Sequence, residues 1–261
     1  MVSGGAQGLR SAAAVLVVAA VLSLQVFGVV GMTVGYLVCV LGLVIAWAFT
    51  IDPPGRFGIA VIGVLVALLV SGAQASEGTS GEVEVLLAGS VLALVAAMVL
   101  QIVRRPPRPG VVASLASAAT LGMIVVSGAL LIPLRDGGRQ VTSMFIGVVA
   151  TTLIVGRLLD AATTTPSVRT GVPRGVLGLV GGLAAGLAAG ALYATGWDGS
   201  DRGVAFGIAA SVAVSAVVVD LVASFVVAEH RKGLVLGAVL TAVIPIFVAT
   251  PAAELTARLL T

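Results

Sequence analysis

The chain has 261 residues, of which 59% are hydrophobic and 10% are charged, and its mean hydropathy is +1.20. These values lie far outside the averages of soluble domains and exclude an ordinary water-soluble fold. The net charge of +3 does not indicate a nucleic-acid partner, because the basic residues stand singly or in short clusters at the ends of apolar runs. The composition predicts one all-α integral membrane domain, a polytopic helical bundle.

Nine apolar runs are long enough to cross a bilayer, which takes about 20 residues. They occupy 11–28, 31–50, 57–72, 85–103, 110–132, 141–158, 175–195, 204–228 and 234–258. The first two form one stretch of about forty residues. A single helix of that length would measure about 60 Å, twice the hydrocarbon thickness, so we expect a turn near residues 28–31. Residues 1–140 are thus predicted to supply five spans and residues 141–261 four.

The loops between these runs alternate in charge. Ten basic residues fall on one side of the predicted bundle: Arg10, Arg56, Arg104, Arg105, Arg108, Arg157, Arg169, Arg174, Arg231 and Lys232. Four fall on the other side, which also carries the acidic residues Glu77, Glu82 and Glu84: Arg135, Arg139, Arg202 and Arg258. The positive-inside rule assigns the more basic side to the cytoplasm. The N-terminus is therefore predicted to be cytoplasmic and the C-terminus to lie outside.

Asp220 is a carboxylate set deep in the apolar run from 203 to 228. It lies about 13 Å from the charged end of that run at residues 229–232. A carboxylate at this depth is costly, which makes it a candidate functional residue. The alternative is an aspartate that faces the bundle, is hydrogen-bonded to a neighbouring Ser or Thr, and has no further role.

A polar stripe sets the expected direction of Asp220. Ser224 follows it by four residues on the same helical face, and Ser211 and Ser215 extend the stripe. Polar side chains of a spanning helix avoid hydrocarbon. We therefore expect Asp220 to point towards the sixth or seventh span, within a cavity open to the cytoplasm or the inner leaflet. A phosphate in that cavity would lie between Asp220 and Arg169, Arg174 and Arg231.

The seventh run carries glycines at every fourth position: Gly178, Gly182, Gly186 and Gly190. Such spacing removes side chains from one face of a helix and lets another backbone approach closely. It predicts a tight helix crossing, more often with a helix of the same chain than with a second subunit.

Neither His230 nor Cys39 indicates a metal site. His230 has no second His or Cys and no paired carboxylate at ligand spacing. Cys39 is the only cysteine and lies within an apolar run, so we expect it to pack there without a disulfide. From His230 and Cys39 the sequence therefore predicts no catalytic residue and no metal ligand.

Four short segments after residue 147 occur in a recognisable order. They are Val155-Gly156-Arg157-Leu158-Leu159, Val172-Pro173-Arg174 followed by Gly178 and Gly181-Gly182, Asp220-Leu221-Val222-Ala223-Ser224, and residues 237–243. In this order they resemble the motifs of the integral membrane phosphatidate cytidylyltransferases (CDP-diacylglycerol synthases). The resemblance covers about the last 115 residues. It implies a membrane enzyme that uses Mg²⁺ and CTP to activate phosphatidic acid.

The chain departs from the family pattern at the chemical positions. Thr151 or Thr152 stands where an Asp is expected, Ala223 replaces a Glu, and the carboxylates of the last motif are absent. Only Asp220 and Ser224 persist. One carboxylate is a poor cage for Mg²⁺, which needs several oxygen ligands in near-octahedral geometry.

Three functions from different classes follow. The first, which the departures favour, is a catalytically inactive relative that serves as a subunit, scaffold or regulator of phospholipid or cell-envelope lipid machinery. The second is an active CTP-dependent enzyme, the only case that requires a cofactor. The third is a small transporter or flippase subunit that uses Asp220.

The expected partners are membrane lipids, with a protein partner or a second copy of the chain. The scarcity of Lys and Asn suggests a GC-rich bacterial genome and hence a bacterial plasma membrane.

Overall fold

The computed structural model describes residues 27–77, 82–104, 110–135, 139–163, 167–169, 172, 174–199, 201–230 and 234–260, with positions 12, 16 and 20. Its helices are α2 (Gly28–Thr50), α3 (Arg56–Glu77), α4 (Glu82–Val103), α5 (Val111–Ala129), α6 (Arg139–Ala162), α7 (Val176–Ala194), α8 (Asp201–His230) and α9 (Leu234–Leu260). A 3-10 turn, η3 (Pro133–Arg135), follows α5.

Within the described residues, eight helices are long and apolar enough to cross a membrane. This confirms the prediction of an all-α, multi-pass membrane protein, and each of these helices coincides with one of the last eight predicted runs. The first predicted span, 11–28, lies almost wholly outside the described residues. The helix α2 begins at Gly28, whose φ of 72° is left-handed, at the place where the turn was expected.

Local chemistry sets the ends of the helices. Between α2 and α3 stand Pro53 and Pro54, which lack the amide proton that a continuing helix requires. Asp52 and Gly55, on either side of them, have φ values of 50° and 81° and turn the chain sharply. The apolar runs 31–50 and 57–72 therefore form two separate helices, α2 and α3.

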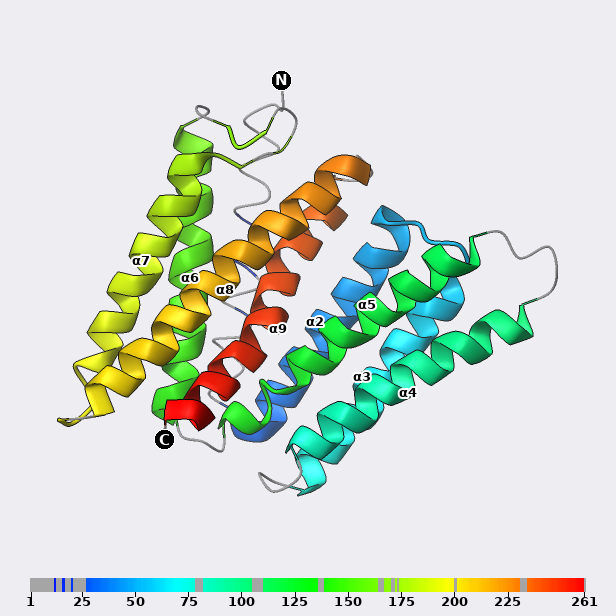
Figure 1. Ribbon diagram of the computed structural model, residues 1–261, viewed down its shortest axis with the longest axis horizontal. Coiled ribbons are helices and arrows are strands. Elements are labelled where there is room, and N and C mark those ends of the chain that lie inside the picture. Colours follow the sequence, from blue (N-terminus) through cyan, green and yellow to red (C-terminus); the bar gives the residue numbers. More distant parts are fainter. Residues whose placement is uncertain are drawn as a thin grey trace.

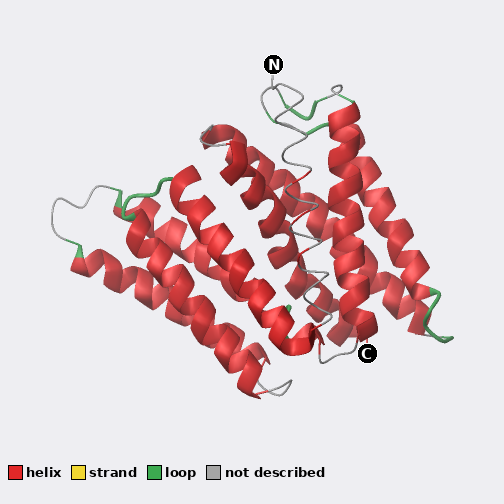
Figure 2. Ribbon diagram, turned by 180° about the vertical axis from the view of Figure 1, so that it is seen from behind, coloured by secondary structure: helices red, strands yellow, loops and turns green. Residues whose placement is uncertain are grey.

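The helices α2, α3, α4 and α5 form a first group, and α6, α7, α8 and α9 pack against one another as a second group. The helix α9 joins the groups because it also contacts α2 and α5, and Figure 1 shows it between them, coloured red. The view from behind in Figure 2 shows the same two groups of helices.

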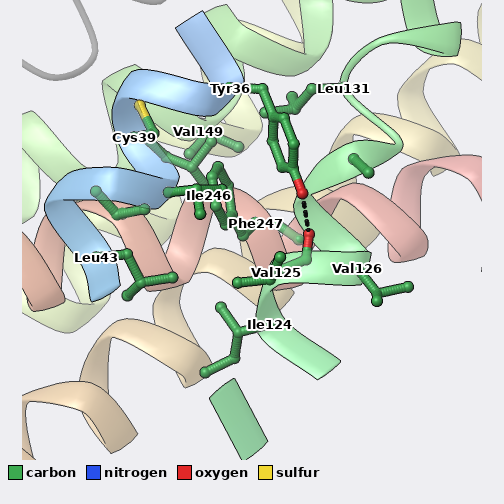
Figure 3. Packing of buried hydrophobic residues seen from close by; sticks show 14 of the residues in the cluster. Tyr36, Cys39, Leu43, Ile124, Val125, Val126, Leu131, Val149, Ile246 and Phe247 are labelled. Carbon is green, nitrogen blue, oxygen red and sulfur yellow. Dashed lines mark hydrogen bonds between the residues drawn. The ribbon is translucent and has the colours of Figure 1, made fainter. Parts of the chain in front are cut away.

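The junction of the groups is built around Tyr36 of α2 and Phe247 of α9, whose ring centroids lie 5.6 Å apart (Figure 3). The Tyr36 hydroxyl donates a 2.9 Å hydrogen bond to the carbonyl of Val125 in α5. Gly128 gives the Phe247 ring its space, since a Cβ at this position would overlap the ring. Both aromatic rings are fully buried, so this contact fixes α9 against the first group.

Candidate functional site: a buried network of arginine and aspartate

Four charged side chains meet inside the second group of helices. Arg157 and Asp160 come from α6, Arg174 from the loop just before α7, and Asp220 from the middle of α8. None of the four is more than 5% exposed. The set contains two positive and two negative groups, so its formal charge is zero. Balanced pairing of this kind is what allows charges to remain buried in a bundle.

Asp220 lies at the centre of the network. Arg157 Nη2 donates to Asp220 Oδ1, and Arg174 Nη2 forms an ion pair with Asp220 Oδ2. Each carboxylate oxygen is therefore held by a different arginine. Asp220 faces the bundle and contacts α6, as the polar stripe predicted. The expectation of an open cavity is wrong, because Asp220 is completely buried and the two guanidinium groups fill the space beside it.

Asp160 connects the network to the start of α7. Its Oδ2 accepts from Arg174 Nη1, and its Oδ1 accepts a 2.8 Å hydrogen bond from the backbone amide of Gly175. Gly175 is the N-cap residue of α7, so Asp160 places a negative charge at the positive end of that helix. Burial and then the charge of Arg157 lower the pKa of Arg174 to about 10, while Asp160 opposes the shift. Arg174 stays protonated at neutral pH.

Arg157 also binds α9 at a carbonyl that a proline has left without a helical donor. In a regular helix the carbonyl of residue 241 would accept from the amide of residue 245, but residue 245 is Pro245 and has no amide proton. Arg157 Nη2 donates to the Thr241 carbonyl at 2.7 Å, and Arg157 Nη1 lies 3.2 Å from Thr241 Oγ1. One guanidinium thus satisfies a backbone group of α9 and the carboxylate of α8.

The glycine face of α7 makes room for this network. Gly178 packs directly on the Asp160 carboxylate, which occupies the space that a Cβ would need. One turn further, a Cβ on Gly182 would lie 2.7 Å from the Thr152 carbonyl oxygen and 3.1 Å from Gly156 Cα. The four glycines of the stripe are buried: the first three approach α6, and Gly190 approaches Ala209 of α8. The prediction of a tight crossing within the same chain is confirmed.

The other predicted phosphate-facing residues have different surroundings. Ser224 is buried on the same face of α8 as Asp220. Arg174 is buried too, but its guanidinium pairs with two carboxylates instead of facing a lipid. Arg169 is exposed in the loop before α7, where the structure describes no ion pair to it. Arg231 lies outside the described residues.

Sequence reasoning missed three members of the network. The sequence patterns use Arg157 only as a topology signal and as part of the first motif segment. The predicted sixth span ends at 158 and leaves Asp160 in the following loop, whereas α6 continues to Ala162. Thr241 was not singled out. A usable signal existed in the spacing of Thr241 and Pro245, which exposes a carbonyl in an apolar helix.

The residues of this site do not fit the divalent metal that the cytidylyltransferase resemblance implies. Mg²⁺ needs carboxylate oxygens that are free to coordinate it. Asp220 Oδ1 and both oxygens of Asp160 already accept hydrogen bonds from arginine or a backbone amide, and Asp220 Oδ2 is ion-paired with Arg174. Among the described residues no group of three or more His, Cys, Asp or Glu side chains is arranged to hold a metal.

Comparison with known proteins finds no matching family model, no matching curated protein and no matching solved structure. The fold and the site therefore define a class only: a multi-pass helical membrane protein with a neutral, buried arginine and aspartate network.

Proposed function

We propose that the chain is a non-catalytic relative of the phosphatidate cytidylyltransferases that serves as a subunit, scaffold or regulator of membrane-lipid machinery. The observation that carries the proposal is the double pairing of Asp220 with Arg157 and Arg174. Asp220 is the one motif carboxylate that the sequence retains, and two guanidinium groups occupy its oxygens.

The origin of the network supports the proposed relationship. Four of its five residues come from the four segments that carry the resemblance: Arg157 from the first, Arg174 from the second, Asp220 from the third and Thr241 from the last. These segments lie far apart in sequence, and Arg157 and Asp220 are separated by 63 residues. Segments that once formed one active site would be expected to meet in this way.

The charge of the network supports the loss of catalysis. Phosphoryl-type transfer from CTP requires positive charge directed at the phosphates, supplied by metal ions and basic groups. Here the positive charge of the arginines is directed at two aspartates and is cancelled by them. Within the network no net charge is left to stabilise a transition state. The same contacts hold α6, α7, α8 and α9 together, which suits a structural role.

An activity assay tests the proposal. Purified protein in mild detergent, given Mg²⁺, CTP and phosphatidic acid, is expected to release no more pyrophosphate than a protein-free control. An active phosphatidate cytidylyltransferase assayed in the same detergent shows that the conditions support turnover. Pyrophosphate release that is lost in Asp220→Asn would overturn the proposal and favour the active-enzyme alternative.

A second measurement separates a subunit from a transporter. Chemical crosslinking in native membranes followed by purification is expected to capture a defined protein partner in fixed ratio. Reconstituted vesicles are expected to show no proton or cation flux that depends on Asp220. Flux that disappears in Asp220→Asn, in a variant shown to be folded, would favour the transporter alternative instead.

A further inference from the structure

The first group of helices contains a groove that lies apart from the network. It runs between α3 and α4, has a volume of about 400 Å³, and is lined by Val70 and Ala73 on one side and Val85, Ala88 and Gly89 on the other. This volume falls within the range of small-molecule sites, roughly 300–1,000 Å³. The small residues Ala73 and Ala88 leave space that larger side chains would fill.

The groove opens towards the bilayer. Leu69 and Leu92 also line it, and both are substantially exposed side chains of spanning helices, with 58% and 39% of their surface accessible. Apolar side chains that are exposed on a spanning helix face lipid. An occupant therefore enters from the membrane, and the apolar lining suits an acyl chain. Along α4 the lining extends from residue 84 to residue 92, which is about 12 Å.

One end of the groove is negatively charged. Glu84 is exposed in the first turns of α4, and it is the single charged residue among those described as lining the groove. A carboxylate at this position attracts an ammonium group and repels an anionic headgroup. The structure describes no basic side chain in the lining that would balance a headgroup of net negative charge.

We propose that this groove binds a membrane lipid with an ammonium headgroup, its acyl chain between α3 and α4 and its ammonium group beside Glu84. The site does not depend on the Asp220 network, because none of its lining residues belongs to α6, α7, α8 or α9. The lipid would fill a gap between two helices that otherwise leave apolar surface uncovered.

Lipid retention tests the proposal. The detergent-solubilised protein is incubated with dioleoyl phosphatidylethanolamine or with dioleoyl phosphatidylglycerol, and the bound lipid is counted by native mass spectrometry. The acyl chains are identical, so the comparison reports the headgroup. We expect several-fold greater retention of the ethanolamine lipid, and Glu84→Gln should reduce it to the level of the glycerol lipid. Glu254→Gln, which removes one charge from α9, is the control and should keep the preference.

A second set of experiments tests the position of the acyl chain. Ala88→Phe should fill the groove and lower retention of both lipids, whereas Leu94→Phe, on an exposed part of α4 outside the lining, should not. Should Ala88→Phe fail to fold, a phosphatidylethanolamine with a photoreactive acyl chain gives the answer in the unmodified protein. Adducts on residues 69–73 and 84–92 support the site. Equal retention of the two lipids by the unmodified protein, or adducts confined to other helices, would overturn it.

Discussion

Arg157 donates a hydrogen bond to the carbonyl of Thr241, a backbone group that Pro245 leaves without its helical donor. A buried carbonyl without a partner is costly in a membrane, where no water can replace the missing bond. The contact therefore ties the end of α6 to the proline-containing part of α9. The same nitrogen of Arg157 also donates a hydrogen bond to Asp220, so it has two acceptors.

Because Arg157 binds the carbonyl that Pro245 leaves without a donor, substitutions at Arg157 and Pro245 are expected to have coupled effects on the free energy of unfolding. Arg157→Lys loses the forked donor geometry and is expected to cost about 1.5–3 kcal/mol of unfolding free energy. In the Pro245→Ala background the Thr241 carbonyl regains a helical donor, so the same change should cost about 1 kcal/mol less. Chemical unfolding in mild detergent measures both values. Pro251→Ala, six residues further along α9, is the control background and should leave the cost unchanged.

Asp220 is expected to be strongly stabilising as a partner of the two arginines. Asp220→Asn leaves Arg157 and Arg174 with Asp160 as their remaining carboxylate in the network, and breaking a buried pair in this way costs about 3–5 kcal/mol. Asp198→Asn changes an exposed aspartate and should shift stability by no more than about 0.5 kcal/mol. A thermal unfolding assay in detergent compares the two variants. Equal stability would mean that the network contributes little to the fold.

The glycine face of α7 gives a matched comparison of two small changes. Gly182→Ala forces a methyl group against the backbone of α6 and is expected to destabilise the protein by about 1–3 kcal/mol. Gly203→Ala, in α8, meets open space and should be neutral or stabilising by up to about 1 kcal/mol, because alanine favours a helix. Both variants replace Gly by Ala in a helix, so the difference between their unfolding midpoints measures the cost of a methyl group where α7 crosses α6.

The orientation in the membrane remains a prediction from the loop charges. With Cys39 first replaced by alanine, a cysteine at Ser80 should react with an impermeant thiol reagent in whole cells, and a cysteine at Ser167 should react only after the membrane is opened. Ser167 is exposed, so its reactivity reports the side of the membrane rather than burial. The reverse pattern would place the loop before α7 outside the cell.

Hydrophobic run length predicted the described spans well, because the bilayer imposes both a length and an apolar surface. It placed the end of the sixth span at 158, one residue after Arg157, whereas α6 continues to Ala162 and includes the charged Asp160. An apolar run does not extend over a charged residue at its end, but a charge that has its partner in the bundle can be buried. The partners, Arg174 and Asp220, come from other helices or loops, and one sequence alone does not reveal such pairings.

The direction of Asp220 was predictable and its environment was not. The four-residue spacing to Ser224 fixed the face of α8 that turns inward. Whether that face meets a cavity or a cation depends on side chains of α6 and of the loop before α7. In this chain it meets the guanidinium groups of Arg157 and Arg174.

The neutrality of the network has a consequence for biosynthesis. Arg157, Asp160 and Arg174 are made before Asp220, so the growing chain carries one uncompensated positive charge near the end of α6 until α8 is complete. The sixth span is therefore expected to stay near the membrane surface, or beside the insertion machinery, until α8 arrives. A chain that stops before residue 201 should be degraded faster in pulse-labelled cells than one that stops after residue 233. We then expect α6 and α8 to leave the insertion machinery and enter the lipid together.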